Sequence, residues 1–368
     1  MQNNINVIFH HPLPLNENAT SASGIRPIQM IKAFKALGCE VDLVTGYAEE
    51  RKQCMLKIKE NIMKGKRYDF VYAESSTMPT ILTEPSHLPS HPFLDWRFFT
   101  FCNNNNIPIG LFYRDIYWLF ETYGNDLNAI KKNVAKLSYR FDLWVYNRTL
   151  TKLYLPSMAM GNYVPGVNPQ IFEPLPPGHV FSEQKFVSEP EIEKTKLKLF
   201  YVGGMSEHYQ MHKLFAAVQD LSMIELTICT REKEWLSVRN EYPTLTPNIR
   251  VVHLSGEEME SELNTSDIAL LFVEPHEYRD FAAPVKLYEY LGNHKPIIAS
   301  EGTLAGQFVS ENGIGWTVPY DVNKLKELLV ALFNDSQNYN DIIHNISRVA
   351  SEHSWESRAA QVIKGLSK

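Results

Sequence analysis

The chain of 368 residues lacks most features of secreted, membrane-spanning and metal-binding proteins. It has only four cysteines, and no two of them form a Cys-x-x-Cys pair. This pattern disfavours a zinc site or a disulfide framework and is typical of a reducing compartment. The first twenty residues lack the basic segment and long apolar run of a secretory signal, and no apolar run is long enough to span a membrane. The sequence therefore indicates a soluble, cytoplasmic protein.

The rest of the composition is that of an ordinary globular protein. Apolar residues make up 44% and charged residues 21% of the chain, and this length corresponds to about two domains. The net charge of −6 conceals an asymmetry: residues 1–185 hold 19 Lys and Arg against 16 Asp and Glu (+3), and residues 186–368 hold 17 against 26 (−9). An acidic chain without a nucleic-acid-binding motif does not predict a nucleic-acid partner.

The basic residues of the first half gather in two segments. Residues 51–67 contain seven Lys or Arg and one Glu, and residues 131–140 contain four Lys or Arg. A solvated helix face explains either segment alone. Two such segments in one half favour, as a second interpretation, a peripheral contact of this half with the anionic inner face of a membrane.

Strand-like and helix-like patterns alternate along the chain. Apolar positions in residues 25–38, for example, recur with a helical period that ends at Gly38. Strands alternating with helices predict an α/β protein with parallel sheets. The predicted strands are residues 5–11, 40–46, 68–74, 107–113, 151–157, 196–204, 224–230, 249–255, 268–274 and 296–300.

A Pro-rich, charged segment without periodicity, residues 173–195, divides these elements and is interpreted as a linker. We therefore predict an N-terminal Rossmann-like domain over residues 1–172 and a second over residues 196–345. Residues 346–368 form a C-terminal helix that packs back toward the first domain. Both domains would be doubly wound and would face each other across a cleft.

Small and charged residues follow the predicted strands. In open parallel sheets, ligands bind beyond the carboxyl ends of the strands. The sequence therefore predicts binding chemistry in the segments there, which are residues 203–208, 230–231, 274–283 and 300–302 in the second half and 11–26, 74–76 and 114–115 in the first.

The segment FAAPVKLYEYLGNHKPIIAS (281–300) combines a short helix with a buried strand. Pro284 suits the start of a helix and Gly292 its end, so this helix has about two turns. Lys286 and Glu289 lie three residues apart and away from the apolar face, near the N-terminus.

This charged pair has two explanations on its residues alone. Backbone N–H groups near Ala283 could approach an anion at the helix terminus, and Lys286 would add a positive charge for a phosphate. Glu289, one turn further, could accept hydrogen bonds from the hydroxyls of a ribose. An ordinary helical ion pair accounts for the two residues equally well.

The segment APVKLYEYLGNHKPIIAS resembles the donor site of retaining GT-B glycosyltransferases of the large family 4 group (glycosyl transferases group 1). The resemblance covers nearly the whole chain. FYVGGMSEHYQMHKLFAAV is similar to the first strand and glycine loop of the family's donor domain. YLPSMAMGNYVPGVNPQIFEP is similar to the end of its acceptor domain, and GIRPIQMIKAFKALGCEVDLVTG to its first loop and helix.

The resemblance implies a role for several residues. Glu289 would hold the nucleotide ribose, and Gly203 and Gly204 would let the backbone approach the diphosphate. Lys286, with the N–H groups around Ala283, would neutralise the leaving diphosphate. Asp115 lies where many members place a His or His-Asp pair beside the reacting sugar; an N-cap or a partner of Arg114 is the alternative.

Other positions are candidate donor or acceptor contacts, or depart from the family pattern. Arg26, which follows Gly24, is explained equally by function and by structure, whereas Arg231 is better explained as a surface residue. His208 imperfectly replaces a cation that often follows the glycine loop. Arg114 stands where a His is frequent, and Phe281 replaces an acidic residue.

The leading hypothesis is a glycosyltransferase of cell-surface polysaccharide synthesis, such as capsule or O-antigen. It would transfer a sugar from a nucleotide-sugar to a glycan or lipid-linked acceptor, as a hexosyltransferase does. The family resemblance implies that the configuration of the transferred sugar is retained. The sequence lacks the metal-binding Asp-x-Asp of the other large glycosyltransferase fold, so we expect no metal or other cofactor. A nucleotide-sugar epimerase on a similar scaffold and a non-enzymatic sugar-binding protein remain alternatives. A dehydrogenase is disfavoured because no Gly-x-Gly-x-x-Gly follows a strand.

Overall fold

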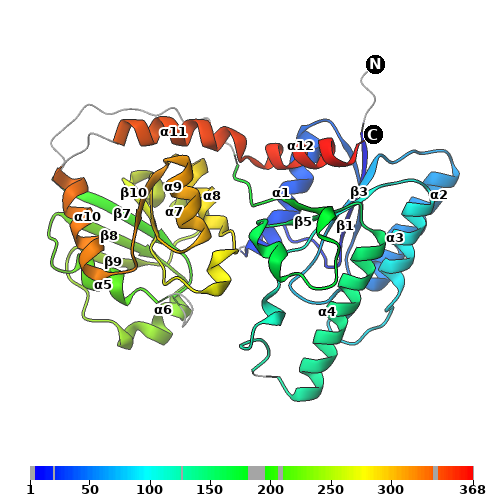
Figure 1. The fold of residues 1–368 in the computed structure, drawn as a ribbon, viewed down its shortest axis with the longest axis horizontal. Helices are drawn as coiled ribbons and strands as arrows, with labels where there is room; N and C mark the ends of the chain where they lie inside the picture. The colour runs from blue at the N-terminus through cyan, green and yellow to red at the C-terminus, as the bar shows by residue number, and fades with distance from the viewer. Residues whose placement is uncertain are drawn as a thin grey trace. The chain divides into compact units, whose positions relative to one another are not determined.

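The computed structural model describes residues 5–19, 21–125, 127–180, 195–205, 210–334 and 339–367. The chain divides into two compact units (Figure 1). The first unit comprises Met1–Pro177 and Trp355–Lys368, and the second comprises Gly178–Ser354. Each unit has its own parallel sheet with helices around it, as alternating strands and helices require.

The sheet of the first unit has the strand order β2-β1-β3-β4-β5-β6, and all its pairings are parallel. Because β2 and β3 lie on opposite sides of β1, the winding direction changes between β1 and β3. The strands are β1 (Asn6–His11), β2 (Glu40–Thr45), β3 (Phe70–Glu74), β4 (Ile109–Phe112), β5 (Lys152–Leu155) and β6 (Phe172–Pro174).

The helices of the first unit include the last helix of the chain. That helix packs against α1, and its buried residues Trp355, Val362 and Leu366 share a core cluster with Phe34 (Figure 1). The helices are α1 (Ala22–Ala36), α2 (Ala48–Met63), α3 (Leu94–Asn104), α4 (Ala129–Thr149) and α12 (Trp355–Leu366).

The sheet of the second unit has the order β9-β8-β7-β10-β11-β12, the arrangement of dinucleotide-binding Rossmann domains. Its winding direction changes between β7 and β10. The strands are β7 (Leu197–Val202), β8 (Ile224–Cys229), β9 (Ile249–Val252), β10 (Ile268–Leu271), β11 (Ile297–Ser300) and β12 (Gly315–Val318). The helices are α5 (His212–Val218), α6 (Glu232–Val238), α7 (Gly256–Thr265), α8 (Val285–Gly292), α9 (Leu304–Asn312), α10 (Val322–Asn334) and α11 (Tyr339–Glu352).

The predicted α/β class and two Rossmann-like sheets are confirmed, and all ten predicted strands are present. Two strands were missed, β6 and β12, and both lie at a sheet edge. Both strands, Phe-Glu-Pro and Gly-Trp-Thr-Val, are short and contain Pro or Gly. Edge strands tolerate these residues because one side of the strand makes no ladder hydrogen bonds.

Three boundaries differ from the prediction. β6 extends two residues into the segment interpreted as a linker, of which residues 181–194 are outside the described residues. Helix α1 begins at Ala22, so Gly24 and Arg26 lie on its first turns instead of in a loop. Residues 346–352 belong to α11 of the second unit, and the separate helix α12 begins at Trp355.

Candidate functional site

Helix α8 brings its charged pair to the carboxyl edge of the second sheet. The Tyr290 hydroxyl accepts a hydrogen bond of 3.0 Å from the backbone N–H of Val202, the last residue of β7. Leu287, Tyr288 and Leu291 are buried, as the apolar pattern predicted. Helix α8 therefore lies at the end of β7, beside the change of winding between β7 and β10, where Rossmann sheets bind ligands.

Lys286 and Glu289 form an ion pair on the outer side of α8. Lys286 Nζ lies 2.5 Å from Glu289 Oε2, and about a third of each side chain is exposed, 32% and 29%. Burial raises the pKa of the Cys229 thiol at the end of β8, and the charge of Lys286 opposes that shift. The ammonium group is therefore close enough to the end of β8 to act on Cys229.

The backbone before α8 is only partly available to a ligand. The Ala282 N–H donates to the Tyr278 carbonyl at 3.1 Å and is therefore occupied. The Ala283 N–H has no hydrogen-bond acceptor among the described residues. Of these two backbone N–H groups, that of Ala283 is the one that could meet an anion.

The glycines after β7 make room for a tyrosine of the same strand. A Cβ at Gly203 would lie 2.4 Å from the Tyr201 Oη, and the Tyr201 hydroxyl donates to the Gly204 carbonyl at 3.0 Å. A side chain at position 203 would therefore displace Tyr201 and the loop that follows it.

The predicted segment 230–231 after β8 contributes one polar group that was not itself a candidate site residue. Thr230 Oγ1 is buried and has no hydrogen-bond partner among the described residues. Its neighbour Arg231 is a surface residue at the start of α6, paired with Glu234 at 2.5 Å, and its side chain is 70% exposed. This placement favours the structural explanation of Arg231. His208 lies outside the described residues.

In the first unit, the candidates Arg26 and Arg114 converge on Glu74 at the end of β3. Glu74 is fully buried and lies 3.3 Å from Arg26 Nε and 2.9 Å from Arg114 Nη2. Arg26 also donates to the carbonyls of Leu175 and Pro176 and stacks 3.5 Å from the Phe112 ring centroid. With 3% of Arg26 exposed, these internal contacts account for the residue.

Asp115 and Gly24 have local roles in the structure. Asp115 Oδ1 accepts the Tyr117 N–H at 2.9 Å, just before the short 3₁₀ turn Tyr117–Leu119, whose N-cap residue is Ile116. This local hydrogen bond leaves the half-buried carboxylate at the carboxyl edge of β4. A Cβ at Gly24 would lie 2.5 Å from the Ala19 Cβ, so this glycine allows close packing of the preceding loop.

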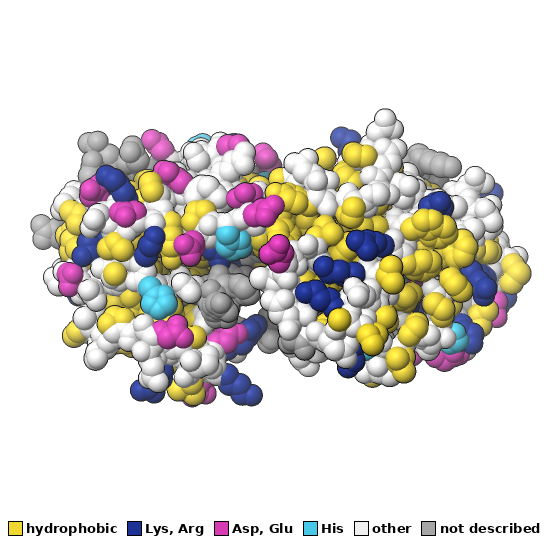
Figure 2. All heavy atoms as spheres, turned by 60° about the horizontal axis from the view of Figure 1, so that its bottom comes forward, with side chains coloured by type: hydrophobic (Ala, Val, Ile, Leu, Met, Phe, Trp, Pro, Cys, Tyr) yellow, Lys and Arg dark blue, Asp and Glu magenta, His cyan; other side chains and the backbone are white. Residues whose placement is uncertain are grey.

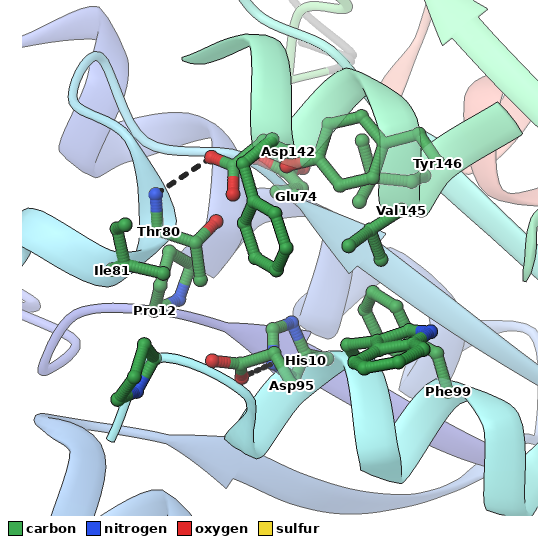
Figure 3. Close-up of a pocket in the computed structure, with 14 residues that line it drawn as sticks. His10, Pro12, Glu74, Thr80, Ile81, Asp95, Phe99, Asp142, Val145 and Tyr146 are labelled. Carbon is green, nitrogen blue, oxygen red and sulfur yellow. Dashed lines mark hydrogen bonds and ion pairs between the residues drawn. The ribbon is translucent and has the colours of Figure 1, made fainter. Parts of the chain in front are cut away.

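A second group of charges surrounds a small cavity in the first unit (Figure 3). His10 Nε2 lies 2.7 Å from Asp95 Oδ1, and Arg51 holds the same carboxylate through two bonds of 3.0 Å. Burial by itself would raise the pKa of Asp95, but the charge of Arg51 and the His10 bond hold it below its usual range. Arg51, predicted as part of an exposed basic segment, is therefore a buried structural residue.

Asp142 of α4 lies on the other side of this cavity. Its carboxylate accepts the Thr80 N–H at 2.7 Å, and burial raises its pKa to about 7. The cavity has room for about one water molecule. His10 Nδ1 is buried and has no partner among the described residues, so it is one polar group that such a water could satisfy.

Two features are absent from the described residues. No group of three His, Cys, Asp or Glu side chains there could hold a metal ion. Among the helices of the described chain, none has the length and apolar character needed to cross a membrane.

No family model matches the chain, and no curated protein matches it in sequence. Solved structures do match. HepE of Anabaena in complex with UDP-glucose is 12% identical, with a TM-score of 0.62 over 98% of this chain and 99% of that one. A glycosyltransferase of Rickettsia africae is 14% identical, with a TM-score of 0.62 over 98% of this chain and 97% of that one. Sucrose-phosphate synthase of Thermosynechococcus elongatus is 13% identical, with a TM-score of 0.62 over 98% of both chains.

These matches and the two parallel sheets define the class of fold. The chain has the α/β GT-B fold, in which two Rossmann-like units follow one another. The Rossmann-ordered second unit carries Gly203, Gly204, Thr230, Ala283, Lys286 and Glu289 together at one edge of its sheet.

Proposed function

We propose that this protein is a glycosyltransferase that uses a nucleotide-sugar donor. The observation that carries the proposal is the Lys286–Glu289 pair, which lies on the first two turns of α8 beside the winding change of a Rossmann sheet. The complex of HepE with UDP-glucose supports a UDP-sugar as the donor. The acceptor would be a glycan or a lipid-linked glycan in cell-surface polysaccharide synthesis, such as capsule or O-antigen. The protein would act in the cytoplasm.

Donor binding would open the ion pair. A pair this exposed contributes about 1 kcal/mol or less, so separating it costs little. Glu289 would then accept the ribose hydroxyls, while Lys286 and the Ala283 N–H would face the diphosphate next to Gly203 and Gly204. Negative charge grows on the leaving diphosphate as the glycosidic bond breaks, and Lys286 would stabilise it without a metal or other cofactor.

The reacting sugar and the acceptor would meet the first unit. We propose Asp115 as the group beside the reacting sugar, because its carboxylate follows β4 at the carboxyl edge of that sheet. Retention of configuration is proposed from the family resemblance. The basic residues of the first unit would bring it to an anionic membrane that carries a lipid-linked acceptor.

The test compares Glu289→Gln and Lys286→Met with matched variants of another surface pair. Lys324 and Glu327 of α10 have the same three-residue spacing, with an Nζ–Oε2 distance of 2.8 Å. Among UDP, GDP, ADP and CMP, we expect UDP to raise the melting temperature most. Glu289→Gln should weaken UDP binding by about 1–3 kcal/mol in calorimetry, because the ribose hydroxyls lose a charged acceptor. Lys286→Met should lower turnover more than affinity.

The α10 control variants Glu327→Gln and Lys324→Met should change neither UDP affinity nor turnover. If the α8 variants behave like the α10 variants, Lys286 and Glu289 are only a surface ion pair, and the proposal is wrong. An epimerase would convert the donor without any acceptor, and a sugar-binding protein would bind free sugar without needing the nucleotide.

A further inference from the structure

The two basic segments of the first unit differ in how their charges are used. In the segment around α2, Lys52 lies 3.1 Å from Glu49, Lys64 lies 3.9 Å from Glu60 and Lys66 lies 2.8 Å from Asp42. Arg51 is buried against Asp95. More than half of the seven basic side chains of residues 51–67 are therefore neutralised within the protein.

The basic side chains of α4 are not neutralised in this way. No ion pair within the described part of the chain involves those side chains. The helix has a single acidic residue, Asp142, which is buried and faces the cavity instead of the surface. The charged side chains on the outer surface of α4 are therefore all cationic: Lys131, Lys132, Lys136, Arg140 and Arg148.

A stripe of apolar side chains runs between these cations. Ile130, Val134, Leu137 and Trp144 are all exposed, with Ile130 at 77% and Leu137 at 62%. Together with the partly buried Phe141 they follow steps of four, three, four and three residues, so they share one helix face. We call these five residues the α4 stripe. The opposite face of α4 is already buried in the first unit, so the stripe is a second apolar face.

The C-terminal end of the stripe is aromatic. Trp144 packs on Trp96 of α3, with ring centroids 5.3 Å apart, and Phe141 packs on Phe93 at 6.0 Å. Phe93 is itself 45% exposed. Figure 2 shows hydrophobic and Lys or Arg side chains mixed across this face of the first unit, with few acidic groups between them. Aromatic and aliphatic side chains bordered by cations are typical of helices that lie in a lipid interface.

We infer that α4 is the element that docks on an anionic lipid bilayer. The α4 stripe would enter the boundary between headgroups and acyl chains, and Lys131, Lys136 and Arg140 would contact lipid phosphates. The inference deepens the membrane contact of the proposed function and rests on it for the choice of partner. It assigns the contact to α4 and not to the α2 segment.

The cations that border the α4 stripe favour a bilayer over a second copy of the chain as its partner. A symmetric dimer through the stripe would place the cationic borders of the two α4 helices against each other, with no exposed acid on either helix to pair with. An anionic membrane complements both the apolar stripe and its borders. A stripe from Ile130 to Trp144 is about 21 Å long, enough for several lipid headgroups.

The test measures binding of the full chain to vesicles of phosphatidylcholine containing about one-third phosphatidylglycerol, by flotation, at low and high salt. The double variant Ile130→Ser/Leu137→Ser should lower the partition coefficient about tenfold or more, because interfacial binding scales with the apolar area that is buried. Lys136→Glu/Arg140→Glu should remove the salt-sensitive part of the binding. The matched control is Leu56→Ser/Met63→Ser on α2, which replaces two similarly exposed apolar residues, at 47% and 78%.

The outcomes separate this inference from the enzymatic proposal. Loss of binding in the stripe variant, with the α2 control and UDP binding unchanged, supports docking through α4. Equal loss in the control, or equal binding of the stripe variant and the parent, overturns the inference. Failure of the parent to bind any vesicle overturns the membrane contact as a whole and leaves UDP binding to test the transferase. A parent dimer that becomes a monomer in the stripe variant identifies a second copy as the partner and also overturns it.

Discussion

Asp142 is a buried carboxyl whose environment favours its protonated form. It lies beside a cavity of the first unit, and its hydrogen bond from Thr80 only partly offsets the burial that raises its pKa to about 7. In the unfolded chain an aspartate has a pKa of about 3.9. Between these two values the folded state holds a proton that the unfolded state has lost, so stability falls as the pH rises through this window.

We therefore predict that Asp142→Asn stabilises the first unit at high pH and much less at low pH. Asparagine keeps the oxygen that accepts the Thr80 N–H but carries no charge at any pH. The expected gain is about 1–3 kcal/mol in the free energy of unfolding at pH 8, shrinking toward zero near pH 4. Urea unfolding at the two pH values measures it. An equal effect at both pH values would contradict a raised pKa of Asp142 in the folded state.

Asp95 is the control for this prediction, because its pKa is shifted in the opposite direction from that of Asp142. Its pKa is lowered by Arg51 and His10, so it is ionised in the folded state throughout the working range. Asp95→Asn should therefore destabilise the first unit at both pH 4 and pH 8, because it leaves the buried Arg51 without its carboxylate.

At the scale of elements, α12 is held by its packing on the first sheet. A Cβ at Gly110 of β4 would lie 2.7 Å from Leu366 Cδ1, so this glycine lets α12 approach the strand closely. Leu366 is 3% exposed and belongs to the same core cluster as Phe9 and Phe34. The last helix is thus part of the hydrophobic core of the first unit, although most of that unit lies some 180 residues or more before it.

We predict that Leu366→Ala destabilises the first unit by about 2–4 kcal/mol, since it removes buried methyl groups and leaves a cavity. The exposed Lys364 on the same helix is the matched control, and Lys364→Ala should change stability by about 0.5 kcal/mol or less. Guanidinium unfolding followed by tryptophan fluorescence is suitable, because four of the six tryptophans (Trp96, Trp118, Trp144 and Trp355) lie in the first unit. Equal stability of both variants would mean that α12 is only loosely attached.

At the scale of the whole molecule, the proposed reaction depends on charges that the protein itself supplies. Lys286 and the N-terminal turn of α8 lie at the edge where a leaving diphosphate would bind. If they provide the stabilisation, the rate of sugar transfer should stay within about twofold when EDTA removes divalent cations. Transfer assays with and without EDTA, repeated on Lys286→Met, measure this. Loss of activity in EDTA that is restored by Mn²⁺ or Mg²⁺ would show that a metal shares the task.

The class of the fold could be predicted from the order of residues alone, whereas the candidate donor site was placed on residues 281–300 with the help of the family resemblance. Apolar runs that alternate with amphipathic segments predict parallel sheets, because strand and helix periodicity depend only on local residue order. Pro284 and Gly292 likewise bracket α8 within one residue of its observed ends. The short edge strands β6 and β12 were missed, because a brief run containing Pro or Gly has no clear periodicity.

Only the tertiary structure decided which charged residues are structural and which are exposed. From the sequence, Arg51 was expected on an exposed basic segment, and Arg26 and Arg114 were candidate donor or acceptor contacts. In the structure they meet the buried Asp95 and Glu74 from distant parts of the chain. In the same way, the structure separates the paired lysines of α2 from the cations of α4, which make no ion pair with any described residue and border an exposed apolar stripe. Local patterns cannot predict these differences, because burial and ion pairing depend on which segments the fold brings together.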